Sequence, residues 1–242
     1  MNALTVNNLS VAYDKKTVLE NVSVSVPMKH LTAIIGPNGA GKSTFLKAVL
    51  NQLPNKVGTV EILGRSFQPK SLIVGYVPQR NAVDWDFPTN AFDIVLMGRY
   101  GHSGLFKRPS KQDKLAAQQA LASVGMQDYA DRSIGQLSGG QQQRVFLARA
   151  LAQNADVYFL DEPFAGVDAA TEKTIIDILK TLKAQGKSIF VVHHDLQTVK
   201  EYFDYTILLN KTIIASGQTE NVFTPDYLQQ TYGGKLFMMK DL

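Results

Sequence analysis

The chain contains no cysteine among its 242 residues, and it has only one tryptophan and four histidines. Without cysteine the protein has no disulfide framework, no thiolate metal site and no cysteine nucleophile. The longest apolar stretches, such as SIFVV at residues 188–192, are far too short to span a bilayer. The opening residues MNALTVNNLSVAYDKK lack the basic start and the apolar run of a signal peptide. We therefore expect a soluble chain that reaches a membrane only through a partner.

A strong excess of charge of one sign is also missing. The formal net charge is +4, and the lysine and arginine residues are dispersed without forming a run. This mild basicity tolerates an anionic ligand or a membrane surface, but it is not the pattern of a nucleic-acid-binding protein. Apolar residues make up 45% and charged residues 19% of the chain, which is typical of a folded domain. We expect no nucleic-acid partner.

The hydrophobic periodicity predicts an α/β fold. The stretches LTVNNLSVAY and TVLENVSVSV alternate with period two and predict antiparallel, half-buried strands. The run LTAIIG is continuously apolar, as buried parallel strands are, and a glycine-rich loop and a helix follow it. After residue 136, helices alternate with the strands DVYFLDE and SIFVVHHD, and the pair YTILL and TIIASG closes the chain.

Residues 81–136 depart from this alternation. FDIVLMGR and KQDKLAAQQALASV have helical spacing, and the second begins with Ser110 and Asp113 in a capping arrangement and ends at Gly125. We expect a single domain over residues 1–242, in which 1–80 and 137–242 form the core together with an N-terminal antiparallel β subdomain. Residues 81–136 are expected to form a helical subdomain.

A glycine-rich loop stands between the predicted strand LTAIIG and the helix after it. The stretch GPNGAGKST matches the pattern G-x-x-x-x-G-K-[ST], whose glycines let backbone N–H groups surround phosphate groups. Lys42 would supply charge to the β and γ oxygens, and the Ser43 hydroxyl can hold Mg²⁺. A glycine-rich turn without a ligand is the alternative, and the spacing disfavours a dinucleotide fold. The candidate phosphate-binding residues are Gly36, Pro37, Asn38, Gly39, Ala40, Gly41, Lys42, Ser43 and Thr44.

Two carboxylates end the buried strand VYFLDE at residues 157–162. In a phosphate site one acid can hold Mg²⁺ while its neighbour, facing the other way by strand alternation, can polarise water. Asp161 fits the first role and Glu162 the second. The alternative is that one of them caps the turn that begins at Pro163. The HHD sequence at residues 193–195 ends the next strand in the same manner, and a histidine there could contact a γ-phosphate, although such a histidine taken alone is more often a surface residue.

The stretch LSGGQQQRV, residues 137–145, offers a second anion-binding feature. Two glycines open into a predicted helix, and a helix start presents backbone N–H groups and about half a positive charge. The alternative for this stretch is an ordinary helix with Ser138 as its N-cap.

The motifs occur in a definite order: GPNGAGKST, Gln79 in YVPQR, LSGGQ, VYFLDEP, GVD at 166–168, and HHD. In this order, and over nearly the whole chain, the sequence resembles the nucleotide-binding subunits of ABC transporters, and LSGGQ is specific to that superfamily. The resemblance implies the P-loop NTPase (ABC ATPase) fold with a mixed parallel sheet at its core. It also implies an ATPase whose cofactors are ATP and Mg²⁺.

The resemblance implies a role for each matching residue. Tyr13 would stack on adenine, Gln79 would sense Mg²⁺ and the attacking water, and Glu162 would be the catalytic base. Asp168 would belong to the loop that crosses between subunits, and His194 would be the switch histidine. The implied Mg²⁺ ligands are Ser43, Gln79 and Asp161.

One position departs from the pattern of the family. The family usually has Thr-His-Asp where this chain has HHD, so His193 occupies the threonine position. We assign the switch role to His194 because it directly precedes Asp195. A neighbouring histidine makes the effect of a single substitution harder to interpret.

The resemblance also explains why one chain has two anion-binding features. The LSGGQ motif has no lysine and no hydroxyl pattern for magnesium, so by itself it should hold ATP poorly. In the family two chains face head to tail, and this motif of one chain covers the γ-phosphate that the other chain holds. We therefore expect a homodimer on ATP binding, with contacts from Ser138, Gly139, Gly140 and Gln141.

Four aromatic residues follow closely after the YVPQR motif: Trp85, Phe87, Phe92 and Tyr100. They form either a groove for a cytoplasmic helix of a membrane subunit, as in the family, or the core of the helical insert. FDIVLMGRY and the tail TPDYLQQTYGG resemble importer ATPases for metal ions, siderophores and vitamin B12. The run DWDFP and the short insert are most similar to those of manganese, zinc and iron importers.

The function implied by this resemblance is ATP-driven import of a metal ion, namely manganese, zinc or iron, at the cytoplasmic face of the cell membrane. The implied partners are integral membrane permease subunits and, indirectly, an extracytoplasmic substrate-binding protein. Four histidines, two of them adjacent at the nucleotide site, make no ligand cluster for a transported metal. The alternatives are a soluble ABC-type ATPase of another machine, such as iron–sulfur cluster assembly, and an importer for a siderophore or vitamin B12.

Overall fold

The computed structural model describes residues 1–14, 16–68, 71–83, 85, 87–103 and 108–233. The chain forms two compact units, one of Met1–Pro69 with Gly186–Leu242 and the other of Lys70–Gln185. Among the described helices, none combines the length and the apolarity that a membrane span requires. The finer division into a core and a helical subdomain at 81–136 stays a prediction.

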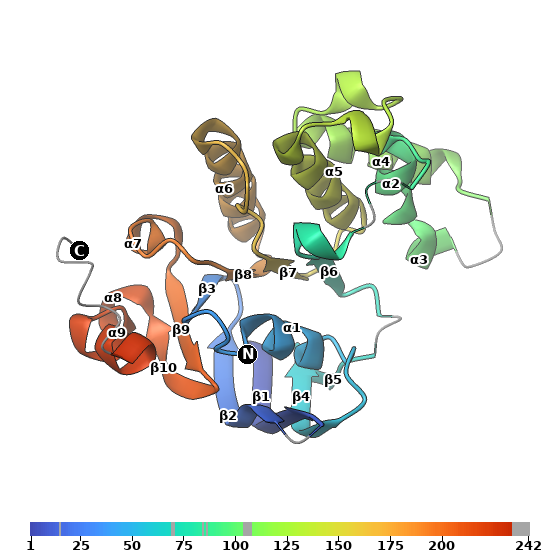
Figure 1. Cartoon of the computed structure of the whole chain (residues 1–242). Coiled ribbons are helices and arrows are strands. Elements are labelled where there is room, and N and C mark those ends of the chain that lie inside the picture. Colours follow the sequence, from blue (N-terminus) through green and yellow to red (C-terminus); the bar gives the residue numbers. More distant parts are fainter. Residues whose placement is uncertain (15, 69–70, 84, 86, 104–107, 234–242) are drawn as a thin grey trace. The chain divides into compact units, whose positions relative to one another are not determined.

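The first unit contains an antiparallel sheet near the N-terminus (Figure 1). Its strands pair in the order β2-β1-β4-β5, and every pairing is antiparallel. In the second half of β2 the side chains alternate between buried and exposed, as the period-two pattern predicts. The prediction of an antiparallel β subdomain is therefore confirmed. The strands are β1 (Asn2–Tyr13), β2 (Lys16–Pro27), β4 (Lys56–Ile62) and β5 (Arg65–Ser66).

The same unit contains a mostly parallel group of strands in the order β10-β9-β3-β8. The central strand β3 pairs in parallel with both β8 and β9, whereas β10 is antiparallel to β9. All residues of β3 and β8 are buried, which explains their continuous apolar sequences. The strands are β3 (Leu31–Ile35), β8 (Ser188–Val192), β9 (Tyr205–Asn210) and β10 (Thr212–Gln218).

The described residues of this first unit include four helices. The helix that follows β3 begins directly after the glycine-rich loop. Figure 1 shows the last two helices beside β9 and β10, and both contact these strands. The helices are α1 (Lys42–Val49), α7 (Val199–Tyr202), α8 (Thr219–Val222) and α9 (Pro225–Tyr232).

The second unit combines two parallel strands with helices. β6 pairs in parallel with β7, and α5 packs against α2, α4 and β6. In the described part of this unit, short 3₁₀ turns occur at η1 (Arg80–Ala82), η2 (Gln127–Tyr129) and η3 (Ile134–Gln136). The strands and helices are β6 (Val74–Val77), β7 (Val157–Asp161), α2 (Ala91–Met97), α3 (Tyr100–Ser103), α4 (Lys111–Ser123), α5 (Gly139–Ala152) and α6 (Ala169–Ala184).

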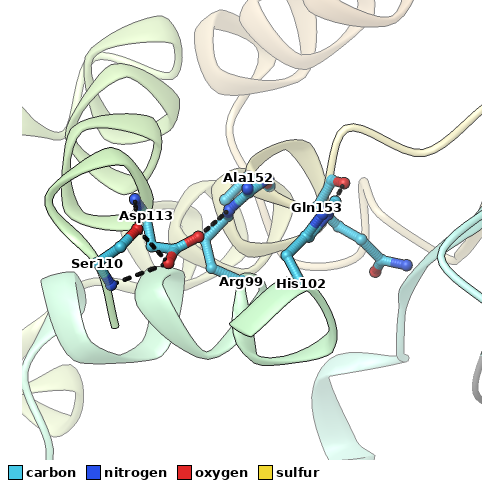
Figure 2. Close-up of polar contacts among 6 residues, drawn as sticks. All are labelled: Arg99, His102, Ser110, Asp113, Ala152 and Gln153. Carbon is cyan, nitrogen blue, oxygen red and sulfur yellow. Dashed lines mark hydrogen bonds and ion pairs between the residues drawn. The ribbon is translucent and has the colours of Figure 1, made fainter. Parts of the chain in front are cut away.

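A polar cluster holds α2, α4 and α5 together (Figure 2). The predicted cap of α4 is confirmed, because Ser110 and Asp113 form a reciprocal capping box. Arg99 donates from Nε to Oδ1 of Asp113 at 3.0 Å and from Nη1 to the carbonyl oxygen of Ala152 at 2.9 Å. The side chains of this ion pair are only 16% and 7% exposed, so Arg99 joins the end of α2 to the start of α4 and the end of α5 in a mostly buried place.

Candidate nucleotide-binding site

The predicted phosphate-binding loop connects β3 to α1, and its glycines are required by geometry. Gly39 and Gly41 have φ values of 81° and 96°, which side-chain-bearing residues rarely adopt. A Cβ atom at Gly41 would lie 2.7 Å from Cδ2 of Leu19. At Gly36 a Cβ atom would lie 1.9 Å from the carbonyl oxygen of Leu209. The loop therefore follows a path that only glycine allows at these positions.

The loop ends at a helix start that fits an anion. Gly41 is the N-cap of α1, and no side chain of the described residues forms a capping hydrogen bond at this end of the helix. Lys42 is only 6% exposed, and its Nζ donates to the carbonyl oxygens of Gly36 at 2.7 Å and Pro37 at 3.0 Å. A buried ammonium group beside an uncapped helix N-terminus is a combination that favours phosphate groups.

The remaining residues of the predicted loop occupy the same turn and helix start. Asn38 is exposed on the turn, and Ala40 is buried, with its N–H donating to the carbonyl oxygen of Pro37 at 3.1 Å. Ser43 and Thr44 are half-buried in the first turn of α1. The structure thus brings all nine predicted residues onto one continuous loop and helix start.

A surface depression of about 670 Å³ lies beside this loop. Tyr13 is 47% exposed on one border of it, and Gly39 of the phosphate-binding loop lies on another. A ligand in this depression can therefore contact an aromatic ring and the glycine loop at once. The depression is lined by Tyr13, Asp14, Lys16, Thr17, Val18, Gly39 and Lys211.

The two adjacent histidines after β8 have opposite environments. His193 is 4% exposed, whereas His194 and Asp195 are exposed. Burial lowers the pKa of His193 to about 4, so its imidazole is uncharged at neutral pH. Of the two rings, only that of His194 faces solvent, which supports its assignment as the residue that reaches a ligand.

The carboxylates at the end of β7 are separated by an unusual backbone conformation. Asp161 is the last residue of β7 and is 2% exposed. Strand alternation does not extend to Glu162, because β7 ends at Asp161 and Glu162 has a left-handed φ of 53°. Such a conformation is costly for a residue other than glycine and is frequent at functional sites. That the two side chains face opposite ways stays a prediction. Tyr76 lies on β6, the strand beside β7. Its pKa is raised to about 12, first by burial and next by the negative charge of Asp161.

Gln79 and Glu162 are brought together although 83 positions separate them. Gln79 lies just after β6, and Glu162 just after β7, the parallel neighbour of β6. The Nε2 atom of Gln79 donates to Oε2 of Glu162 at 2.8 Å. This contact joins two of the three residues to which the family resemblance implies a catalytic role, and it comes directly from the parallel pairing of their strands.

The LSGGQ motif forms the start of α5. Ser138 is the N-cap, and its Oγ accepts from the N–H of Gln141 at 3.3 Å while Oε1 of Gln141 accepts from the N–H of Ser138 at 2.9 Å. The interpretation of Ser138 as a cap is therefore confirmed. A Cβ atom at Gly140 would lie 3.2 Å from Oγ1 of Thr171, so glycine permits the close approach of α6.

Sequence reasoning missed Arg80, which joins the Gln79 segment to α5. Its guanidinium donates to Oε1 of Gln142 from Nε at 3.3 Å and from Nη2 at 3.1 Å. A Cβ atom at Gly139 would lie 3.0 Å from Cζ of Arg80, so the guanidinium packs directly on this glycine. The carbonyl oxygen of Arg80 accepts from Nε1 of Trp85 at 3.0 Å. The only feature of the sequence that could have indicated this role is that Arg80 is a basic residue directly after Gln79.

Asp168 lies at the start of α6 and is exposed. It is the N-cap of this helix, and its Oδ1 accepts from the N–H of Thr171 at 2.7 Å. Hydrogen bonds from the backbone and then the side chain of Thr171 lower the pKa of Asp168. The carboxylate is therefore charged at neutral pH and fixes the chain path out of the GVD sequence.

The aromatic residues after the YVPQR motif have two kinds of environment. Trp85 is half-buried and packs edge-on against Phe146 of α5, with ring centroids 5.0 Å apart. Phe87 and Tyr100 are 53% and 48% exposed. Phe92 is half-buried, and the two aspartates of the DWDFP run lie outside the described residues. The exposed rings are available to a partner, whereas Trp85 packs inside its own unit.

Comparison with known proteins identifies the family. The family model described as ABC transporter matches residues 19–165, which is more than half of the chain. The chain therefore belongs to the ABC transporter family, as an ATP-binding subunit with the P-loop fold. This family hydrolyses ATP to drive transport, and its ATPase domains bind ATP or ADP.

Particular relatives cover nearly the whole chain. The manganese transport system ATP-binding protein MntB of Bacillus subtilis is 58% identical over 241 residues, which are 100% of this chain and 96% of that protein. The zinc transport system ATP-binding protein TroB of Treponema pallidum is 57% identical over 234 residues, with 97% and 88% covered. The ATP-binding cassette MJ1267 in its ADP conformation superposes with a TM-score of 0.80 at 26% identity, covering 97% of this chain and 100% of that one.

Proposed function

We propose that this chain powers the import of a metal ion, manganese or zinc, through a separate permease in the cytoplasmic membrane. The observation that carries the proposal is its identity of 58% and 57% with two ATP-binding proteins named for manganese and zinc transport, over 96% and 88% of their lengths. Iron–sulfur cluster assembly is less well supported, because both of these relatives are named for transport systems.

ATP is proposed to bind along the loop from Gly36 to Thr44, with its base against Tyr13. The support is the uncapped start of α1 with the buried Lys42, together with the depression that borders both Tyr13 and Gly39. In this arrangement Lys42 neutralises charge on the β- and γ-phosphates. The tyrosine ring provides a flat surface for the base.

Mg²⁺ is proposed to bind to oxygen atoms of Ser43, Gln79 and Asp161. A hydroxyl, an amide carbonyl and a carboxylate form the donor set that this hard cation prefers. When bound, Mg²⁺ would neutralise the negative charge that develops on the phosphates. Glu162 would polarise the attacking water, and the hydrogen bond from Gln79 Nε2 at 2.8 Å holds its carboxylate in one orientation.

The LSGGQ motif is proposed to complete the ATP site of a second copy of the chain in a homodimer. Its support is the start of helix α5, where Ser138 is exposed and Gly139 and Gly140 are half-buried. The adjacent Arg80 adds positive charge at the same place. Asp168, exposed at the start of α6, would lie in the loop between the subunits, and His194 would contact the γ-phosphate.

The permease is proposed to dock on the exposed apolar side chains of the second unit. Phe87, Met97 and Tyr100 are 53%, 38% and 48% exposed, a large apolar area for residues close in sequence. Docking there would hold the chain at the cytoplasmic face of the membrane. An extracytoplasmic substrate-binding protein would act through the permease.

The experiment is metal uptake into membrane vesicles that contain the chain and the permease encoded beside it. We expect ATP-dependent uptake of radioactive manganese or zinc, and a Phe87→Ala/Tyr100→Ala variant that keeps its ATPase activity but leaves the membrane fraction and supports no uptake. Leu115→Ala is the matched control, because Leu115 is 54% exposed on α4 of the same unit. A chain that stays in the soluble fraction, or uptake that does not depend on ATP, would contradict the proposal.

A further inference from the structure

We infer that His193 is a positioning residue: through Thr198 it fixes the loop that presents His194. The inference rests on the proposed function, in which His194 contacts the γ-phosphate. His193 itself is buried and is assigned no contact with ATP.

The backbone and the ring of His193 are anchored on two sides. Its N–H donates to the carbonyl oxygen of Ile34 at 3.1 Å, which extends the pairing of β8 with β3 beyond Val192. Its ring lies 5.1 Å from the ring of Phe203 and 6.3 Å from that of Tyr202, at the end of α7. His193 therefore joins the strand that leads into the phosphate-binding loop to the helix that follows HHD.

A chain of hydrogen bonds closes the loop between residues 193 and 198. The Nε2 atom of His193 lies 2.8 Å from Oγ1 of Thr198, and this hydroxyl lies 3.2 Å from Oδ2 and 3.3 Å from the backbone oxygen of Asp195. Because both of its neighbours on Asp195 are acceptors, the single hydroxyl proton of Thr198 is donated there. His193 must then carry its proton on Nε2 and donate it to Thr198.

The position of His194 follows from these hydrogen bonds. His194 stands between His193 and Asp195, and both neighbours are held by the same hydroxyl. The Oδ1 atom of Asp195 also accepts from the N–H of Gln197 at 2.9 Å, which stiffens the turn. The exposed imidazole of His194 is therefore carried on a loop that is fixed at both ends.

Burial keeps the imidazole of His193 uncharged. Burial, with a smaller contribution from His194, holds its pKa low, and the neighbouring Asp195 opposes this only in part. The donor role of His193 should consequently be constant between pH 6 and pH 8. A threonine at position 193, as in the usual family pattern, has no atom as far from its Cα as Nε2 and cannot make the contact with Thr198.

The test compares two replacements of His193 in the full-length chain. His193→Phe keeps a ring and removes the donor, and kcat should fall about three- to tenfold, the effect of one neutral hydrogen bond. His193→Gln places an amide N–H near the position of Nε2, and it should restore kcat. The affinity for ATP should stay within about twofold in both variants, because the phosphate-binding loop is unchanged.

The same replacement is then made in a chain that lacks His194. His194→Ala alone should lower kcat about a hundredfold or more. In this background His193→Phe should cause no further loss, because it acts only through His194. A general structural defect would instead add its three- to tenfold loss in both backgrounds, and this result would overturn the inference.

The other outcomes are also decisive. If His193→Phe does not fold, as judged by thermal unfolding, Thr198→Val breaks the same chain from a half-buried position and should give the same pattern. Normal kcat in His193→Phe, or equal losses in the phenylalanine and glutamine variants, would overturn the inference while leaving the proposed function intact. Normal kcat in His194→Ala would refute the inference together with the proposed role of His194, whereas the proposed import function is tested separately by the uptake experiment.

Discussion

Replacing Glu162 by glutamine is the substitution that separates ATP binding from ATP hydrolysis. Nε2 of Gln79 donates to Oε2 of Glu162 at 2.8 Å, and a glutamine at position 162 still offers an amide oxygen for this contact. Exchanging a charged acceptor for a neutral one weakens the hydrogen bond by about 1 kcal/mol, or about fivefold in rate. Removing a general base costs about a hundred- to ten-thousandfold, or about 3–5 kcal/mol. The loss of the base therefore dominates, and we expect kcat to fall about a thousandfold.

Glu162→Gln should change the chemistry of the side chain without disturbing the backbone at this position. Residue 162 has a φ of 53°, and the steric cost of this conformation arises at Cβ, which glutamate and glutamine share. Glu162→Gln should thus fold like the parent chain and bind ATP with similar affinity. Because hydrolysis no longer opens it, the ATP-bound homodimer should accumulate.

The assay is phosphate release at saturating ATP, with the dimer measured by sedimentation. Gln79→Ala is the informative comparison, because it removes this hydrogen bond and one proposed Mg²⁺ ligand but leaves the general base in place, and it should cost about tenfold. Glu201→Gln, at an exposed position on α7, is the control and should hydrolyse ATP normally. Our reasoning would be refuted if Glu162→Gln kept more than about a tenth of the activity, or if Gln79→Ala were equally inactive.

Three further predictions concern the loop, the dimer and the polar cluster of the second unit. Lys42→Ala should weaken ATP binding by about tenfold or more, because it removes a charged donor; unchanged affinity for a fluorescent ATP analogue would contradict the loop assignment. Mixing Lys42→Ala chains with Ser138→Arg chains should restore one composite site per heterodimer, and phosphate release above that of either variant checks this; no recovery despite demonstrated pairing would argue against a shared site. Asp113→Asn should lower the free energy of unfolding in urea by about 2–4 kcal/mol, because it weakens the buried pair with Arg99, whereas the exposed Asp128→Asn should change it by less than about 0.5 kcal/mol.

Much of the fold was predictable because the hydrophobic pattern of a segment agrees with the burial of that segment in the structure. The alternation in residues 16–27 predicts a strand with one buried face, and β2 has it in its second half. The apolar run at residues 31–35 predicts a buried parallel strand, and β3 is buried throughout. The cap at Ser110 depends only on residues three positions apart, so a sequence pattern suffices to find it.

Features that depend on distant parts of the chain were not predictable. The contact of Arg80 with Gln142 joins residues 62 positions apart, and nothing in the local pattern indicates it. The burial of His193 beside the exposed His194 depends on Tyr202 and Phe203, whose rings lie against the ring of His193. The left-handed backbone conformation of Glu162 could not be predicted from the sequence either, because glutamate disfavours positive φ values.

The two glycine-rich helix starts show that one residue type meets two different physical requirements. In the phosphate-binding loop, Gly39 and Gly41 have positive φ, so the backbone path itself excludes other residues. At the start of α5, Gly139 and Gly140 are helical, and their missing side chains instead make room for Arg80 and Thr171. The first loop is therefore fixed by its own backbone, whereas the second is shaped by the side chains packed against it. A helix start of the second kind depends on its neighbours, which agrees with a motif that acts on a phosphate already bound by another chain.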